Sequence, residues 1–329
     1  MTDGNPNPKQ MPGQSDVAEP MSVADAAELT QEVIENIERV IVGKRTAAEH
    51  ILTTVLARGH LLLEDVPGVG KTMLARSVAR SIDCSFRRVQ FTPDLLPSDI
   101  TGVNVFNQKN REFEFQPGPV FANIVLGDEI NRAPPKTQSA LLEAMEEEQV
   151  TVDGETYQVP QPFTVIATQN AVERDRTYDL PIAEVDRFMK QITIGYPESD
   201  DESEVLRRVV GTHPIDEIEA VTSADQISRA RKTVSNVTVE APIREYATSL
   251  ANYTREHANL GVSPRGAISL VRAAQARAVL EDREYVIPDD IKREAYAVLS
   301  HRIRREANQR VGQGGEELVE AALENVPVE

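Results

Sequence analysis

The chain is poor in cysteine, histidine and long apolar runs, and each shortage excludes a class of protein. The single cysteine, Cys84, cannot form a disulfide within the chain, which fits a reducing cytoplasm. No apolar run approaches the ~20 residues that a membrane-spanning helix requires. The polar N-terminus lacks the basic and apolar regions of a secretory signal. We therefore expect a cytoplasmic protein without a membrane span.

Metal-binding patterns and excess positive charge are also lacking. The five histidines are scattered and none has metal-ligand spacing to the cysteine. Acidic residues outnumber basic ones, 53 to 35, and the net charge is −18. Such a charge repels phosphate backbones, so general binding of nucleic acid is disfavoured. Acids spread along the whole chain also suggest a halophilic protein, and an ordinary acidic protein is the alternative.

What is present divides the 329 residues into about two domains, since ~150 residues per domain is usual. Residues 1–22 are rich in Asn, Pro, Gly and Gln, and we predict a disordered acidic and polar tail. Residues 23–197 alternate between helical and strand patterns, which is typical of an α/β domain with a parallel sheet. Residues 198–312 show helical patterns alone, and residues 313–329 form a C-terminal helix and tail.

Short apolar or β-prone runs predict the strands of this sheet. The predicted strands are residues 60–64, 87–91, 123–127, 163–168 and 191–195. Between residues 149 and 159, two β-prone runs flank Asp153-Gly154, which suits a two-residue hairpin turn with positive φ at both positions. The predicted helices after residue 197 are 202–210, 224–234, 242–257, 264–280, 288–305 and 316–324.

The strongest functional signal is a phosphate-binding loop between the first strand and a helix. The loop runs through Pro67-Gly68-Val69-Gly70-Lys71-Thr72. Glycines let the backbone N–H groups approach phosphate closely, and the helix that follows adds the positive end of its dipole. We expect Lys71 to contact the β- and γ-phosphates and Thr72 to bind Mg²⁺. The first glycine of the usual G-x-x-x-x-G-K-[ST] pattern is replaced by Asp65.

Two further strands end in polar residues. Asp128 and Glu129 follow the apolar run 124–127, so both acids should reach the carboxyl edge of the sheet beside the phosphate loop. Asp128 would hold Mg²⁺, directly or through water, and Glu129 would orient and polarise the attacking water. Asn170 ends the strand that begins near residue 163, and its amide could bind the γ-phosphate or that water.

Longer motifs resemble the MoxR family of AAA+ ATPases, in the branch with an insertion in helix 2. The most specific is Asp-Glu-Ile-Asn-Arg-Ala-Pro-Pro-Lys-Thr-Gln at residues 128–138, followed by Leu-Leu-Glu-Ala-Met at 141–145. The others are residues 91–102, Leu180-Pro181, Asp186-Arg187-Phe188 and Ser263-Pro264-Arg265. The resemblance covers about residues 33–326. Gly127 and Ala171 stand where the family more often has Ala and Pro, and no catalytic side chain is lost.

The resemblance implies an αβα P-loop nucleotide-binding domain followed by a small all-helical lid, assembled into hexameric rings with ATP between subunits. Asn170 matches sensor 1, and Arg265 matches sensor 2, which reaches the nucleotide of its own subunit. Arg187 matches the arginine finger that acts on a neighbour; Arg132, Arg174 and Arg176 are rivals for that role, and Arg187 could instead pair with Asp186. The implied nucleotide contacts are Val42, Gly43, Pro67, Gly68, Val69, Gly70, Lys71, Thr72 and Met73.

The implied activity is Mg²⁺-dependent ATP hydrolysis coupled to remodelling of partner proteins or to insertion of metal or cofactor into them. Partners of the family are usually proteins with von Willebrand factor A domains. The alternatives are a metal-chelatase ATPase subunit, a nucleic-acid motor or loader, and a scaffold that binds ATP without turnover. The acidic hairpin residues Asp153 and Glu155 count against nucleic acid, and the presence of Glu129, Asn170 and Arg187 counts against a scaffold.

Overall fold

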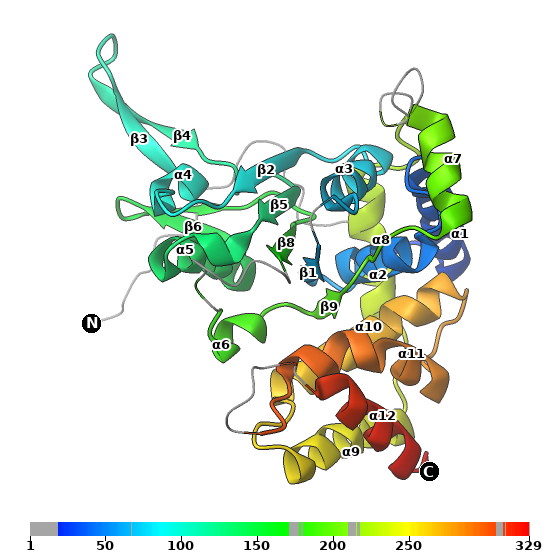
Figure 1. Cartoon of the computed structure of the whole chain (residues 1–329). Helices are drawn as coiled ribbons and strands as arrows, with labels where there is room; N and C mark the ends of the chain where they lie inside the picture. Colours follow the sequence, from blue (N-terminus) through cyan, green and yellow to red (C-terminus); the bar gives the residue numbers. More distant parts are fainter. Residues whose placement is uncertain are drawn as a thin grey trace.

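A five-stranded parallel sheet forms the centre of the protein. The computed structural model describes residues 19–66, 68–170, 178, 180–209, 215, 218–306, 312 and 314–328. The strand order is β2-β5-β8-β1-β9, and every pairing is parallel (Figure 1). The strands are β1 (Leu61–Asp65), β2 (Phe86–Gln90), β5 (Ile124–Asp128), β8 (Thr164–Asn170) and β9 (Lys190–Ile192). The predicted parallel sheet is confirmed.

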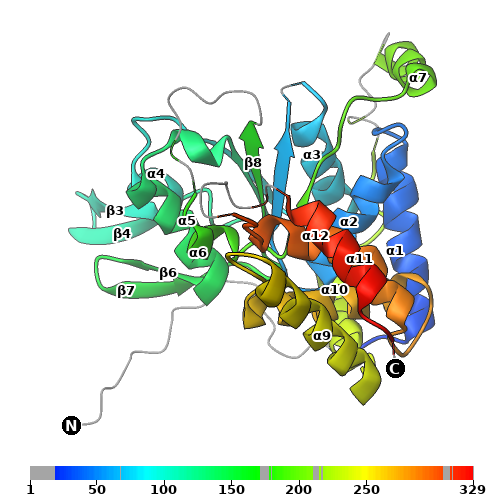
Figure 2. The ribbon, with the colours of Figure 1, turned by 60° about the horizontal axis from the view of Figure 1, so that its bottom comes forward.

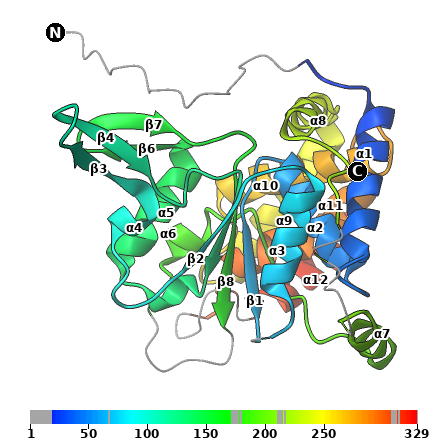
Figure 3. The same cartoon turned by 90° about the horizontal axis from the view of Figure 1, so that it is seen from above.

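Helices cover both faces of this sheet, which explains why its central strands β1, β5 and β8 are largely apolar and buried. Leu61 and Leu63 of β1 pack on one face, whereas Leu62 packs on the other, because successive side chains point to opposite faces. Figure 3 shows the two helical layers on either side of the strands. The layers are α1 (Val23–Glu38), α2 (Arg45–Leu56) and α3 (Lys71–Ser81) on one face, and α4 (Pro97–Thr101) and α5 (Pro135–Glu147) on the other.

Two hairpins extend from the α5 side of the sheet. Strands β3 (Gly102–Asn107) and β4 (Glu112–Pro117) form the helix-2 insertion and project away from the body (Figure 1). Strands β6 (Gln149–Val152) and β7 (Glu155–Gln158) form the second hairpin. Its turn has φ of 50° at Asp153 and 85° at Gly154, as the sequence predicts.

Five helices after β9 pack against the α1–α3 layer in one continuous hydrophobic core. Figure 2 shows α9, α11 and α12 grouped together, away from the two hairpins. The five helices are α8 (Ala224–Asn236), α9 (Ala241–His257), α10 (Pro264–Leu280), α11 (Pro288–Leu299) and α12 (Gly315–Asn325). The helix α7 (Ser199–Val209) also follows β9, and the short α6 (Ile182–Val185) precedes it. None of the helices in the described ranges has the length and apolar character that a bilayer-spanning segment needs.

Two predicted elements end at least three residues early, and each has a local cause. The last strand ends at Ile192 rather than at residue 195, because the N–H groups of Ile194 and Gly195 donate to the Asp65 carboxylate instead of to a neighbouring strand. Helix α11 ends at Leu299 and a 3₁₀ turn, Ser300–Arg302, follows. The turn brings the buried Arg302 guanidinium onto the Phe188 carbonyl, 2.7 Å away. Most of the predicted N-terminal tail lies outside the described residues.

Candidate active site

The phosphate loop joins the end of β1 to the start of α3, in the context that the sequence predicts. Gly68 and Gly70 have φ of 87° and 94°, in the left-handed region that favours glycine. A Cβ added at either glycine would meet no atom within 4 Å, so the space against the loop is open. This open loop at a helix N-terminus fits a bound phosphate. Thr72 and Met73 lie half-buried in the first turn of α3, and Pro67 lies outside the described residues.

Lys71 supplies a positive charge that no acidic side chain in the described ranges neutralises. Its Nζ donates to the carbonyl oxygens of Asp65, at 3.1 Å, and of Val66, at 3.0 Å. Neutral carbonyls leave the ammonium charge in place, so it remains able to attract a phosphate. The Lys71 side chain therefore lies against the start of the phosphate loop, where it is expected to bind phosphate.

Asp65, the residue that departs from the usual glycine pattern, has a structural role. Its buried carboxylate accepts hydrogen bonds from the backbone N–H groups of Val66, at 2.8 Å, and of Ile194 and Gly195, each at 2.7 Å. One side chain thus ties the start of the phosphate loop to the segment that leaves the sheet after β9. The sequence shows the departure at residue 65 but gives no sign of these partners.

Asp128, the predicted Mg²⁺ ligand, ends β5, and Glu129, the predicted catalytic acid, directly follows it, two strands from the phosphate loop in the sheet order. Asp128 accepts a hydrogen bond from the Thr168 hydroxyl at 2.7 Å and forms an ion pair with Arg88 of β2 at 2.5 Å. An oxygen ligand held in this way fits Mg²⁺. The Arg88 guanidinium contacts an Asp128 oxygen that a cation would bind, so a cation at Asp128 has to compete with Arg88.

Glu129 has φ of 57°, so the chain turns sharply where the strand ends. Its carboxylate accepts hydrogen bonds from the Gln90 amide at 2.9 Å and from Arg132 at 2.7 Å. Its own N–H donates to the Thr168 hydroxyl at 2.9 Å. Arg132, a rival trans-acting arginine, therefore contacts the Glu129 of its own chain. The sequence analysis missed Arg88, Gln90 and Thr168. Gln90 ends β2, whereas Arg88 and Thr168 lie within β2 and β8, so only the order of strands around β5 brings them to these acids.

Asn170 lies between the acids and the phosphate loop. It ends β8, the strand between β5 and β1, and its Cα is paired with that of Asp65. The half-buried side chain stands at the same edge of the sheet as Asp128 and Lys71. The strand order therefore places Lys71, Thr72, Asp128, Glu129 and Asn170 along the carboxyl edge of the sheet.

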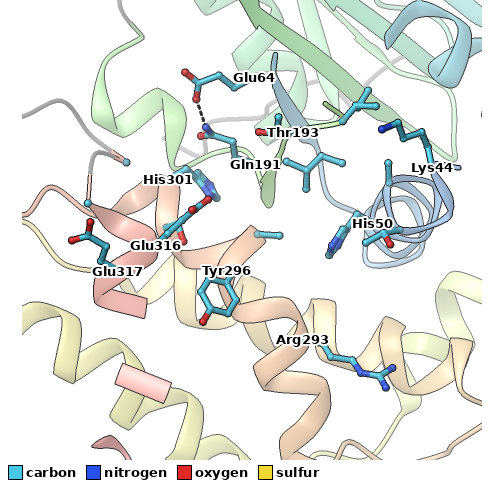
Figure 4. A pocket seen from close by; sticks show the side chains of 18 of the residues that line it. Lys44, His50, Glu64, Gln191, Thr193, Arg293, Tyr296, His301, Glu316 and Glu317 are labelled. Carbon is cyan, nitrogen blue, oxygen red and sulfur yellow. Dashed lines mark hydrogen bonds between the residues drawn. The ribbon is translucent and has the colours of Figure 1, made fainter. Parts of the chain in front are cut away.

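A cavity of about 610 Å³ opens between the nucleotide domain and the lid (Figure 4). Gly43 and His50 line it from the α2 side, Glu64 and Gln191 from the sheet, and Tyr296 from α11. Gly43 has φ of 69°, in the left-handed region that favours glycine, and a Cβ there would displace the Asp201 carboxylate, which would lie 1.8 Å away. Val42, half-buried, directly precedes it. The cavity is therefore next to the segment expected to contact the nucleotide.

The two remaining predicted arginines lie together at the opposite edge of the sheet. Arg187 pairs with Glu146 at 3.2 Å, and Arg265 pairs with the same carboxylate. Met145, next to Glu146, accepts a hydrogen bond from His60 just before β1, whereas the phosphate loop follows the end of β1. A five-residue strand spans roughly 16 Å. In this structure Arg265 therefore lies away from the phosphate loop of its own subunit, and Arg187 pairs with Glu146, whereas Asp186 pairs with Arg302.

Comparison with known proteins is consistent with this geometry. Residues 60–190 match the family described as ATPase family associated with various cellular activities (AAA), and residues 250–322 match an AAA lid domain. The chain is 39% identical over 284 residues to the chaperone MoxR1 of Mycobacterium tuberculosis, covering 83% of this chain and 75% of that protein. It is 31% identical to the protein MoxR of Methylorubrum extorquens, covering 88% and 92%. The chain belongs to the MoxR family of AAA+ ATPases.

Two further relatives extend the match over most of the chain. A protein of Bacillus subtilis named YeaC is 53% identical over 281 residues, which cover 85% of this chain and 88% of that protein. A crystal structure from Cytophaga hutchinsonii, of a protein classed as an ATPase, has a TM-score of 0.85 at 38% identity and covers 93% of this chain and 97% of that chain. The MoxR fold, a parallel-sheet AAA domain followed by a helical lid, is thus established.

Family membership leaves individual site residues to be tested. Arg174 and Arg176, the other rivals for the trans-acting role, lie outside the described residues. Of the candidates that are described, Arg132 contacts Glu129, and Arg187 and Arg265 share Glu146. In this MoxR-family chain the described candidate arginines therefore lie at two different edges of the sheet, Arg132 at the carboxyl edge and Arg187 and Arg265 at the opposite one.

Proposed function

We propose that this MoxR-family chain hydrolyses ATP with Mg²⁺ in a ring, most simply a hexamer, where each active site is completed by a neighbouring copy. The observation that carries the proposal is the separation of the site into two halves. Lys71, Asp128 and Glu129 lie at the carboxyl edge of the sheet, whereas Arg187 and Arg265 lie at the other edge. Two such halves form one site only when the second half comes from another subunit, as in a head-to-tail ring.

In the proposed site, the loop of residues 67–73 and Lys71 bind the β- and γ-phosphates of ATP. Thr72 and Asp128 would hold Mg²⁺, which would neutralise phosphate charge. Glu129 orients a water molecule and accepts its proton while the oxygen of that water bonds to the γ-phosphorus and the bond to the β,γ-bridging oxygen breaks. Asn170 positions the water or the γ-phosphate, and Arg187 of the neighbour stabilises the charge that develops.

We further propose that the adenine and ribose occupy the cavity beside Gly43. Its volume of about 610 Å³ is adequate for a nucleoside, since ligand pockets usually measure roughly 300–1,000 Å³. Its walls come from both domains, so nucleotide bound there would contact α2 and the lid helix α11 together. Binding of ATP would then add direct contacts to the lid, which carries Arg265.

The proposed role of hydrolysis is chaperone-like remodelling or maturation of protein clients, including proteins with von Willebrand factor A domains. The name of the MoxR1 relative, a chaperone, supports protein clients. So does the β3–β4 hairpin, where Phe106 and Phe113 are 49% and 71% exposed. Exposed aromatic side chains that project from the body are typical of protein-binding surfaces.

A cytoplasmic location and a high-salt environment remain proposals from composition. Stable folding and full activity in dilute buffer would contradict the high-salt proposal.

The test is ATP hydrolysis measured across a series of protein concentrations for the wild type, Arg187→Ala and Glu129→Gln. We expect the specific ATPase activity of the wild type to rise with protein concentration, and we expect both variants to be inactive. Activity that is flat with concentration and survives Arg187→Ala would contradict a shared site. ATP binding without turnover by the wild type would favour the scaffold alternative. A pull-down with Glu129→Gln, which should retain ATP, would then identify clients.

A further inference from the structure

Glu146, at the end of α5, is the common partner of the two arginines that lie far from their own phosphate loop. Its Oε2 lies 3.2 Å from the Arg187 guanidinium, and its Oε1 accepts a hydrogen bond from Arg265. The carboxylate has two oxygens and uses one for each arginine. Arg187 also donates to the Leu142 carbonyl at 2.9 Å, which aligns it along the same helix. One side chain therefore bridges the nucleotide domain, the arginine that precedes β9 and the lid.

The backbone beside Arg187 is fastened to the lid independently. Asp186 accepts hydrogen bonds from the Ser263 hydroxyl, at 3.0 Å, and from the Arg302 guanidinium, at 2.8 Å. Ser263 is the N-cap of α10, the helix that carries Arg265 in its first turn. Residues 186 and 187 and the start of α10 thus form one unit, and Glu146 is the contact that holds both guanidinium groups of this unit against α5.

We propose that Glu146 is a positioning residue that holds Arg187 and Arg265 together in the absence of a neighbour. When the adjacent subunit binds, both arginines leave Glu146 and contact the triphosphate of that subunit. This inference rests on the proposed function. Both arginines are partly exposed, 28% and 47% of their side-chain surface, so an incoming anion can reach them. A triphosphate carries more negative charge than one carboxylate and accepts bidentate hydrogen bonds from guanidinium groups. Assembly into an active ring therefore replaces the Glu146 carboxylate with the triphosphate as the partner of both arginines, so the Glu146 contacts have to break.

The test compares Glu146→Gln with Glu147→Gln, a matched change at an exposed residue of the same helix end. The measured quantity is the protein concentration at which specific ATPase activity is half-maximal, with the maximal rate and the thermal unfolding of each variant as controls. Exposed ion pairs contribute up to about 1 kcal/mol each, so we expect Glu146→Gln to lower this concentration roughly three- to tenfold. Glu147→Gln should leave it unchanged, and Glu146→Asp should give an intermediate value.

The same comparison in an Arg265→Ala background, followed as ATP-dependent self-association by sedimentation because Arg265 belongs to the proposed site, separates restraint of the arginines from a general structural effect. With one of the two pairs already absent, the effect of Glu146→Gln should shrink, because the two changes act on a shared contact. An unchanged or raised half-maximal concentration, or an effect that is independent of Arg265, would overturn the assignment of Glu146. A wild type whose activity does not depend on concentration and survives Arg187→Ala would instead overturn the shared site, so the two failures are distinguishable.

Discussion

The Asp65 carboxylate accepts a hydrogen bond from the backbone N–H of Gly195, 2.7 Å away. The contact joins the start of the phosphate loop to the point where the chain leaves the sheet for the lid. Ile194 makes the same contact at 2.7 Å, and the carboxylate is almost fully buried. A buried acceptor with several backbone donors fixes both segments. The departure from the glycine pattern is thus a structural link between nucleotide site and lid connection.

Asp65→Gly restores the usual glycine pattern, yet we expect it to harm the protein. The buried N–H groups of Ile194 and Gly195 lose their acceptor, which costs about 1–3 kcal/mol each. We expect the free energy of unfolding to fall by about 2–4 kcal/mol and ATPase activity to fall with it. Chemical denaturation and steady-state ATPase assays check this, with Asp65→Asn as the variant that keeps one acceptor oxygen. A glycine variant at least as stable and active as the wild type would contradict the role of Asp65.

Arg88→Gln tests the competition at Asp128. The variant removes the ion pair at 2.5 Å and leaves the carboxylate free for Mg²⁺. A partly exposed pair contributes up to about 1 kcal/mol, so we expect the Mg²⁺ concentration for half-maximal ATPase activity to fall roughly two- to fivefold. Arg87→Gln, at an exposed neighbour on the same strand, is the control. A higher Mg²⁺ requirement in Arg88→Gln would mean that Arg88 helps to build the metal site.

His60 makes the stability of the fold depend on pH. Burial lowers the pKa of His60 to about 4, while the Nδ1 atom accepts from the Val165 N–H at 3.0 Å. An unfolded histidine has a pKa of about 6.5, so between these values the unfolded state alone binds a proton and stability falls as the pH drops. The stability is complete above about pH 6.5, and the loss by pH 4 is roughly 3 kcal/mol.

Denaturation of the wild type and of His60→Gln across pH 8 to 5 checks this prediction. The variant should be less stable at pH 8 and should lose less stability on acidification. His50 and His301 have pKa values lowered by burial as well, so part of the pH dependence should persist in the variant. Equal slopes for the two proteins would show that His60 does not titrate as proposed.

A buried ion pair attaches the sheet to the lid. Lys190 of β9 and Glu294 of α11 are fully buried, 2.7 Å apart, and Arg277 of α10 contacts the same carboxylate at 2.9 Å. Removing one partner leaves an unpaired buried charge, so Lys190→Met should lower the free energy of unfolding by about 3–5 kcal/mol. Combining it with Glu294→Gln should cost less than the sum of the single changes. Additive losses in this double-mutant cycle would contradict a coupled pair.

The sequence predicts the sheet and the phosphate site well because both depend on local pattern. Short apolar runs define the strands, and Gly70-Lys71-Thr72 lies where strand, loop and helix are expected. The partners of Asp65, Asp128 and Glu129 depend on strand order, which brings together residues that are far apart in the sequence. The position of Arg265 depends on how the lid docks. A motif match identifies this residue but cannot show which edge of the sheet it lies beside.

The central claim, a site completed by Arg187 of another subunit, is tested most directly by mixing two inactive variants. Glu129→Gln and Arg187→Ala should each be inactive alone, since a trans arginine is worth roughly 10³–10⁵ in rate in related phosphoryl transfer. In an equal mixture, an Arg187→Ala subunit beside a Glu129→Gln neighbour has one complete site. Random mixing then predicts recovery of about a quarter of wild-type activity at the same total concentration. A mixture as inactive as its components would contradict a shared active site.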